Sequence, residues 1–310
     1  VQHALASGEY DGAIWLEGSP NVEETSYWLN LLIDTRLPIC GNASQRPHGA
    51  VGNEGDRNIV DSVNYITSRV WAGADGSNEL GVVVIQDQRI FSAREVQKGD
   101  ARPGGYVVTG GHGGILGGLP EERPPTITFR PAMRHTFHSA LALPRLPATV
   151  TGLGGQRVRV KDGDALLASA IPAVTFVKQS RYSNWGVEEI EARIAANLSA
   201  GGLAGFVGEG QAPYGTMNQW LDKALEKATF SGMPVVKVGR GDQQGFAQRR
   251  NPLFIAGSNL TATKARLLLM AALLKLGALP AADDPLHPSA AEADALRAKL
   301  EEFQEIFDTH

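Results

Sequence analysis

The sequence predicts an α/β protein with two unequal α/β domains, and three observations lead to this fold class. Apolar runs alternate with helix-like stretches between residues 11 and 94, as in parallel sheets whose strands are joined by helices. A β-α-β-α-β succession follows between residues 170 and 239. A stretch rich in Pro and Gly, residues 131–168, lies between the two blocks. Domain boundaries are expected within that stretch.

The first domain is predicted to span residues 1–145, and a linker, 146–168, leads to the second at 169–310. In the first domain the expected strands are GAIWL, LPICG and LGVVVI, and the expected helices cover residues 22–33 and 56–71. The tetrapeptide QDQR between two apolar runs predicts a hairpin at the end of the sheet. Residues 99–125 are dominated by Gly and Pro and are expected to form a loop.

The second domain shows the same alternation. Its expected strands are AIPAVTFVK, LAGFVG and MPVVKVG, separated by helices in WGVEEIEARIAANLSAG and YGTMNQWLDKALEKATFSG. The stretch 261–277 is apolar on nearly all sides and is expected to be a buried helix. A final amphipathic helix over 289–308 is predicted to pack through one apolar face; that face carries Leu296, Leu300, Phe303 and Phe307.

Composition narrows the range of functions. The 310 residues carry a formal net charge of −4 with no basic block, which argues against partners such as nucleic acid or anionic membrane. The single cysteine, Cys40, excludes an intramolecular disulfide. No HExxH motif or paired metal-ligand spacing is present, so neither a metal nor another cofactor is expected. No apolar run reaches the roughly 18 residues that a membrane span requires.

The chain begins at Val1, in VQHALASGEYDG, which reads as the end of a helix and a turn into a strand. We therefore expect that an upstream segment is missing. A targeting sequence could have been removed with it, which leaves the compartment open, with the cytoplasm favoured.

The corner LEGSPN joins the first strand to the first long helix and has two interpretations. In the simpler one, Ser19 or Asn21 caps the helix, and Glu23 and Glu24 complement the helix dipole. In the other, Ser19 is a nucleophile, because α/β proteins place reactive groups where a strand ends and a helix begins. Capping residues are far commoner than nucleophiles, so the corner alone favours the first interpretation.

Two further stretches offer candidate groups. Lys98 in SAREVQKGD precedes a Gly-rich loop and could accept a proton from a serine hydroxyl, although a solvated lysine is the commoner case. The loop VGEGQAPYG, residues 207–215, presents backbone N–H groups beside Glu209 and Gln211 and could hold a carboxylate or amide. It lacks the spacing of a phosphate-binding loop.

The ordered segments YDGAIWLEGSPNVEETSYWLNL, LPICGNASQRP, GVVVIQDQRIFSAREVQK, GFVGEGQ and GSNLTATKARLLLMAALLKLG resemble the bacterial L-asparaginase/glutaminase family over essentially the whole chain. The resemblance implies a larger, flavodoxin-like or Rossmann-like amino-terminal domain, truncated here at its start, and a smaller α/β carboxyl-terminal domain. It also implies a homo-oligomer, dimer or tetramer. The family's first strand and loop, with a nucleophilic Thr and an assisting Tyr, would precede this chain, or a separate fragment or chain would supply them.

The resemblance also implies roles for individual residues. Ser19 takes the place of a family Thr and Lys98 matches the family Lys, so these two are assigned as catalytic. Pro20 stands where the family has Asp, Glu17 replaces a His, and Asn21 replaces a Thr. We assign Glu17, Gly18, Pro20, Asn21, Glu209 and Gln211 to substrate binding, and find no equivalent of an acidic residue expected near position 246.

These residues predict an asparaginase-like amidohydrolase for a small amide, imide or lactam other than L-asparagine. The family Asp engages the substrate's α-amino group, and a proline supplies neither charge nor an N–H donor. Leaving an ammonium unpaired in a closed site costs several kcal/mol. Ser19 is either the nucleophile or a supporting residue for a Thr on the absent segment. The alternative is a non-catalytic descendant that binds a ligand or has a regulatory role.

Overall fold

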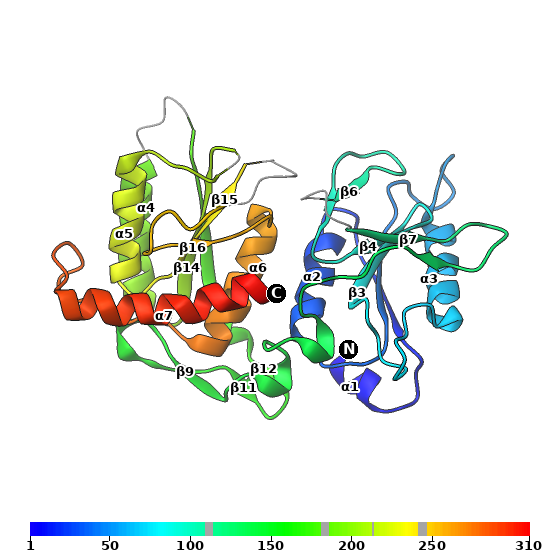
Figure 1. Ribbon diagram of the computed structural model, residues 1–310, viewed down its shortest axis with the longest axis horizontal. Helices are drawn as coiled ribbons and strands as arrows, with labels where there is room; N and C mark the ends of the chain where they lie inside the picture. Colours follow the sequence, from blue (N-terminus) through cyan, green and yellow to red (C-terminus); the bar gives the residue numbers. More distant parts are fainter. Residues whose placement is uncertain (109–113, 181–185, 213, 241–246) are drawn as a thin grey trace. The chain divides into compact units, whose positions relative to one another are not determined.

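The protein was analysed as a computed structural model, which describes residues 1–310 except 109–113, 181–185, 213 and 241–246 (Figure 1). The chain divides into two compact units, Val1–Ala142 and Leu143–His310. The second unit is the longer one in this chain, whereas the resemblance implies a larger amino-terminal domain. The predicted linker, residues 146–168, is counted within the second unit.

The first unit contains a six-stranded mixed sheet in the order β1-β2-β3-β4-β7-β8. Strands β1 to β3 are parallel, and the later pairs are antiparallel. The three parallel strands and the hairpin β3–β4 confirm the predicted order. The strands are β1 Ala13–Leu16, β2 Ile39–Asn42, β3 Val82–Gln86, β4 Arg89–Ser92, β7 Ile115–Gly118 and β8 Thr126–Ile127.

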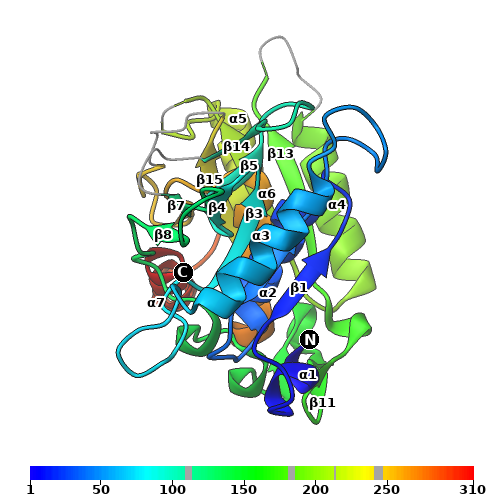
Figure 2. The same cartoon turned by 90° about the vertical axis from the view of Figure 1, so that its right-hand side faces the viewer.

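Two long helices cover this sheet from opposite sides (Figures 1 and 2). The helices are α1 Gln2–Ala6, α2 Val22–Leu32 and α3 Gly55–Ser68, with a short 3-10 turn at Thr136–His138. Successive residues of a strand face opposite sides, so Val83 packs with Tyr65 of α3 while Val84 packs with Val22 of α2. Helix α2 approaches β2 closely at Gly41, where a Cβ would overlap the hydroxyl of Ser26.

The prediction of a continuous loop over residues 99–125 is wrong. A hairpin forms from β5 Val96–Lys98 and β6 Tyr106–Val108, and β7 enters the main sheet beside β4. Glycine in this stretch indicated a loop, but Gly117 is needed for close packing within the sheet. A Cβ at position 117 would overlap the backbone oxygen of Thr126 on the neighbouring strand.

The second unit is built on a parallel four-stranded sheet in the order β13-β14-β15-β16. Three of its strands were predicted, and the two-residue β16 was not. The strands and helices are β13 Ala173–Lys178, α4 Gly186–Ala200, β14 Ala204–Gly210, α5 Gln219–Phe230, β15 Val235–Gly239, β16 Ile255–Ala256, α6 Ala262–Leu276 and α7 Ala290–Thr309. Short elements precede them: 3-10 turns at Leu143–Arg145, Leu153–Gly155 and Ala168–Ala170, and hairpins of β9 Thr149–Thr151 with β10 Arg157–Arg159 and β11 Lys161–Asp162 with β12 Ala165–Leu166.

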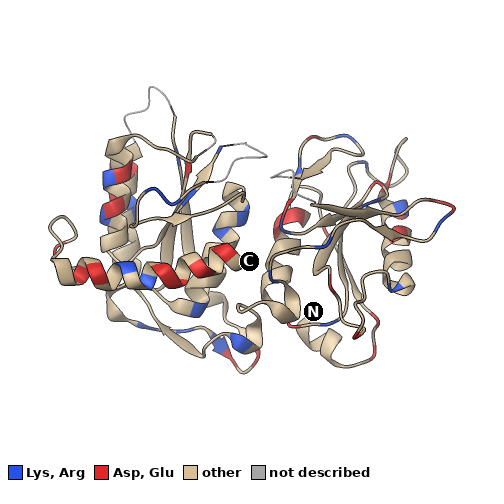
Figure 3. Cartoon of the chain, viewed as in Figure 1, with Lys and Arg blue, Asp and Glu red and all other residues tan. Residues whose placement is uncertain are grey.

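Helices α4 and α5 pack on one face of this sheet around Phe206, while α6 contacts β13, β14 and β15. Helix α6 is almost entirely buried, as predicted, and none of the helices described is long and apolar enough to span a membrane. The predicted apolar face of α7 is also confirmed, because Leu296, Leu300, Phe303 and Phe307 are all buried. Acidic and basic residues are interspersed along the ribbons of both units (Figure 3).

Candidate active site

The corner that follows β1 is a tight turn. The backbone N–H of Glu17 donates to the carbonyl of Asn42 (3.0 Å), which extends the β1–β2 pairing by one residue. The chain then folds back on itself: the N–H groups of Asn21 and Val22 both donate to the carbonyl of Gly18, at 3.0 and 3.3 Å. Helix α2 starts at once, and Ser19 lies within the turn.

Ser19 does not act as a helix cap. The N-cap residue of α2 is Asn21, and its side chain makes no capping hydrogen bond within the described part of the chain. The hydroxyl of Ser19 instead accepts a hydrogen bond from Nζ of Lys98 at 2.7 Å, and both side chains are half-buried. Of the two interpretations of the corner, the geometry therefore favours the reactive pair.

The β5–β6 hairpin brings two side chains to Ser19. Lys98 and Tyr106 are opposite each other in the antiparallel register. While Lys98 contacts the hydroxyl of Ser19, the phenol of Tyr106 donates to its carbonyl oxygen at 2.7 Å. The backbone N–H of Lys98 donates to the carboxylate of Glu23 in α2. The hairpin is thus fixed to both the turn and the first turn of the helix.

Acidic groups surround this arrangement. Burial, followed by the nearby carboxylates of Glu23 and Glu54, raises the pKa of Tyr106, so its phenol stays protonated and remains a donor to Ser19. One carboxylate oxygen of Glu54 accepts the backbone N–H of Gln45. Its other oxygen is buried and has no hydrogen-bond partner among the described residues.

The remaining residues of the corner are exposed or half-buried. Pro20 and Asn21 are exposed, and the carboxylate of Glu17 accepts a hydrogen bond from the indole of Trp15 at 3.0 Å. The backbone N–H groups of Gly18 and Ser19 donate to no acceptor among the residues that the structure describes. Two adjacent free N–H groups can stabilise an oxyanion that forms beside the Ser19 hydroxyl.

Glu209 and Gln211 belong to the second unit, at the carboxyl end of β14. The carboxylate of Glu209 lies 3.1 Å from Nζ of Lys178 and 3.6 Å from Nε of Arg240. Gln211 is exposed, and its backbone N–H donates to the carbonyl of Thr216 at 2.9 Å. Residues 241–246 lie outside the described residues, and so does most of the region where an acidic residue was expected.

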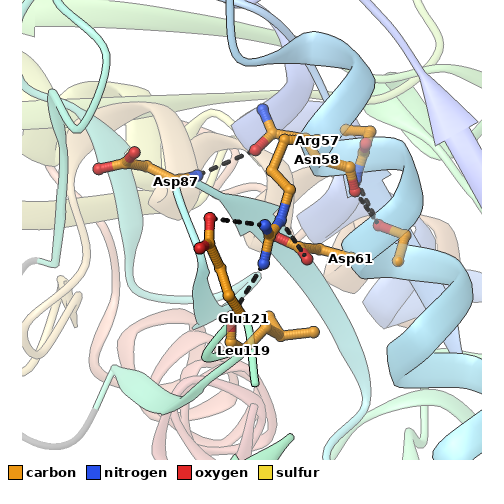
Figure 4. A network of polar contacts seen from close by, with 8 residues as sticks. Arg57, Asn58, Asp61, Asp87, Leu119 and Glu121 are labelled. Atoms are coloured by element: carbon orange, nitrogen blue, oxygen red, sulfur yellow. Dashed lines mark hydrogen bonds and ion pairs between the residues drawn. The ribbon is translucent and has the colours of Figure 1, made fainter. Parts of the chain in front are cut away.

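A polar network beside α3 supports the first unit (Figure 4). Asn58 donates to the carbonyl of Ala43 at 3.0 Å and to the side chain of Gln86 at 2.8 Å, and accepts from the backbone N–H of Asp87. Because Ala43 and Asp87 follow directly after β2 and β3, Asn58 ties both strand ends to the helix.

Arg57 extends the network on the same helix. Its guanidinium binds Asp61 at 2.8 Å and Glu121 at 3.0 Å, and lies 3.5 Å from the carbonyl of Leu119 (Figure 4). Burial raises the pKa of Asp61 in spite of the guanidinium beside it. In the described ranges, no group of three or more His, Cys, Asp or Glu side chains could hold a metal.

The sequence interpretation missed Tyr106 and the contact of Glu23 with Lys98. Glu23 was explained by the helix dipole, and Tyr106 lies in the stretch that was expected to be a loop. The strands of the hairpin, VQK and YVV, are only three residues long, and the first is largely polar, so they give little signal in the sequence.

Here a serine hydroxyl is hydrogen-bonded to a lysine amine, and the backbone N–H groups of Gly18 and Ser19 lie alongside. This arrangement is found in hydrolases that use a hydroxyl nucleophile. Comparison with known proteins finds similarity to asparaginases. Residues 1–103 match the family model described as "Asparaginase, N-terminal". The chain is 27% identical to L-asparaginase 2 of Bacillus subtilis over 89% of its length, and spans 64% of that protein.

Two other relatives point to the same family. A glutaminase-asparaginase of Acinetobacter glutaminasificans is 26% identical over 89% of this chain and 74% of its own length. The crystal structure of a probable cytoplasmic L-asparaginase from Campylobacter jejuni has the same fold, with a TM-score of 0.73 and 22% identity over 99% of this chain and 80% of that one. The chain is therefore similar to asparaginases in sequence over most of its length and in fold.

Proposed function

We propose that the protein is an amidohydrolase for a small amide, imide or lactam other than L-asparagine, with Ser19 as nucleophile and Lys98 as proton carrier. The observation that carries this proposal is the 2.7 Å hydrogen bond from Nζ of Lys98 to the hydroxyl of Ser19. A nucleophile and its base must lie within hydrogen-bond distance, and this pair does.

The reaction follows from the groups at the corner. With the lysine as a neutral amine, Oγ of Ser19 attacks the substrate carbonyl while its proton moves to Nζ of Lys98, and the carbonyl oxygen becomes an oxyanion beside the N–H groups of Gly18 and Ser19. The C–N bond then breaks and Lys98 returns the proton to the leaving nitrogen. Water hydrolyses the resulting ester of Ser19 by the same proton path, which releases the acid and restores the hydroxyl.

Pro20 supports a substrate without an α-amino group. It is exposed beside Ser19 and has neither a carboxylate nor an N–H donor to offer an ammonium. An amide, imide or lactam without an α-ammonium group needs no carboxylate partner at position 20, so the proline does not weaken its binding. We therefore expect turnover of L-asparagine to be weak beside that of neutral amides.

The assembly and the partners are also proposals. The relatives' family favours a homo-oligomer with a small-molecule amide as substrate, and a segment outside this chain could add further catalytic groups. Pro20 is the observation that favours the second candidate, a non-catalytic protein that binds small carboxylates or amides at this corner.

Lys98→Met tests the proposal on a panel of neutral amides, imides and lactams, with L-asparagine for comparison. Release of ammonia or ring opening is measured. We expect kcat on the preferred substrate to fall by about 10²–10⁴-fold, because a proton carrier contributes that much. KM should change little, because in the proposed mechanism the lysine acts on the hydroxyl of Ser19 and does not hold the bound substrate.

The matched control is Lys223→Met, which removes an exposed lysine of α5 in the second unit and should leave kcat unchanged. An unchanged kcat in Lys98→Met would contradict the proposed mechanism. If the unaltered protein is stabilised by small carboxylates in thermal unfolding but turns over no member of the panel, the binding protein is the correct function.

A further inference from the structure

The second unit contains a small cavity that is separate from the residues assigned above. Its volume is about 130 Å³. It is bounded by α5 and β15, by residues 214–217, and by the segment 248–256 that leads into β16. Because a water molecule occupies roughly 30 Å³ in the liquid, the space is right for a molecule of a few heavy atoms.

A buried lysine forms one wall. Lys237 of β15 is 8% exposed, and its Nζ donates to the carboxylate of Asp222 at 2.6 Å and lies 5.0 Å from the ring centre of Phe254. Burial lowers the pKa of Lys237, which indicates that Asp222 offsets only part of the cost of desolvating the ammonium. The carboxylate of Glu226, one turn further along α5 from Asp222, accepts a hydrogen bond from Asn251.

Two arginines line the same cavity. Arg249 donates to Glu301 at 2.6 Å and to the carbonyl of Pro252 at 3.1 Å. Its Nε is buried and has no hydrogen-bond acceptor among the described residues. The guanidinium of Arg250 lies over the ring of Tyr214, 4.4 Å from its centre.

Positive side chains outnumber negative ones in the described lining of the cavity, while Glu301, which pairs with Arg249, lies outside that lining. The charged side chains among its described lining residues are those of Lys237, Arg249 and Arg250 on the positive side and Asp222 on the negative side. A buried guanidinium N–H without an acceptor costs free energy, which an added acceptor would recover. An oxyanion would supply that acceptor and a further hydrogen-bond acceptor for Lys237.

We propose that this cavity binds a small carboxylate or another oxyanion of similar size, held by Lys237 and Arg249. This binding site is additional to the proposed amidohydrolase site, and none of its lining residues was assigned to that site. Its wall includes Thr216, whose carbonyl accepts the backbone N–H of Gln211, so an occupant would lie beside the turn that carries Gln211.

Isothermal titration calorimetry of the whole protein tests the site, with malonate and inorganic phosphate as probes at constant ionic strength. We expect one equivalent of at least one probe to bind with a Kd of about 1 mM or tighter. The probe that binds distinguishes a carboxylate from a phosphate ligand. The readout is heat of binding, so a failure here leaves the proposed hydrolase untouched.

The variant Lys237→Met with Asp222→Leu removes the ion pair as a whole, so that no buried charge is left unpaired and the fold is preserved. It should weaken binding by about tenfold or more, and Arg249→Gln should do the same. The control is Lys227→Met, which removes another lysine-carboxylate pair of α5, that with Glu191 of α4, and should bind as the unaltered protein does. Absence of binding by both probes, or equal binding by the double variant, would show that Lys237 and Asp222 form only a structural ion pair.

Discussion

Ser19 is held from two directions at once. Its hydroxyl meets Lys98 and its carbonyl meets Tyr106, and both partners come from facing positions of one hairpin. A hydroxyl nucleophile needs a fixed distance to its base, because displacements of about 1 Å can cost a hundredfold in rate. In the proposed mechanism, Tyr106 is a positioning residue, because its phenol holds the backbone of Ser19.

Tyr106→Phe removes the hydrogen bond to the carbonyl of Ser19 and keeps the buried ring. We expect a loss of about 1–3 kcal/mol in the free energy of unfolding, since the carbonyl is left without its donor. We also expect kcat to fall by about tenfold, with little change in KM. Denaturant unfolding and steady-state kinetics measure the two effects. A variant with unchanged kcat would mean that the turn keeps its geometry without this bond.

The sequence selected Ser19 and Lys98 as candidates because both lie in segments with a clear resemblance, and the structure brings their side chains together. It could not identify Tyr106, since the contact depends on the register of two three-residue strands across a turn. The cap interpretation of Ser19 could be rejected only from the structure, in which Asn21 is the N-cap residue of α2 and the Ser19 hydroxyl contacts the lysine amine.

At the scale of the elements, α2 carries the corner and must lie close to β2. Gly41 makes this possible, because the hydroxyl of Ser26 occupies the space that a Cβ at position 41 would need. The long helices and the parallel strands were predicted, because apolar periodicity is a strong signal over such lengths. Strand β7 was missed, because its glycines are required for close strand packing and look like loop residues in a sequence.

Gly41→Ala should destabilise the protein by about 1–3 kcal/mol, because the added methyl group overlaps the Ser26 side chain in a packed core. Adding Ser26→Ala removes the overlapping oxygen and should restore part of the loss. A double-mutant cycle from urea unfolding measures this coupling. Additive effects of the two changes would show that α2 shifts away from β2 instead.

At the scale of the whole molecule, pH acts on stability through a buried histidine. Burial, with a smaller effect from His138, lowers the pKa of His135 to about 4. A histidine in the unfolded chain has a pKa near 6.5. Between about pH 4 and pH 6.5 the unfolded chain therefore binds a proton at this histidine, while the folded chain keeps it neutral. The neutral histidine contributes fully above about pH 6.5, and its contribution is lost as the pH falls toward 4.

His135→Gln should flatten this part of the stability profile. In the unaltered protein the change in the free energy of unfolding amounts to at most about 3.5 kcal/mol, since each pKa unit is worth about 1.4 kcal/mol. Urea unfolding at a series of pH values from 4 to 7 measures it. A variant whose stability falls as steeply as that of the parent would assign the acid sensitivity to other groups.

The two alternating blocks of the sequence predict two domains, while the proposed function depends on one corner between β1 and α2. The kcat of Ser19→Ala on the amide that the unaltered protein hydrolyses fastest tests the central claim most directly, once its thermal midpoint shows that it is folded. If Ser19 is the nucleophile, kcat falls by about a thousandfold or more. A kcat equal to that of the unaltered protein would contradict the account.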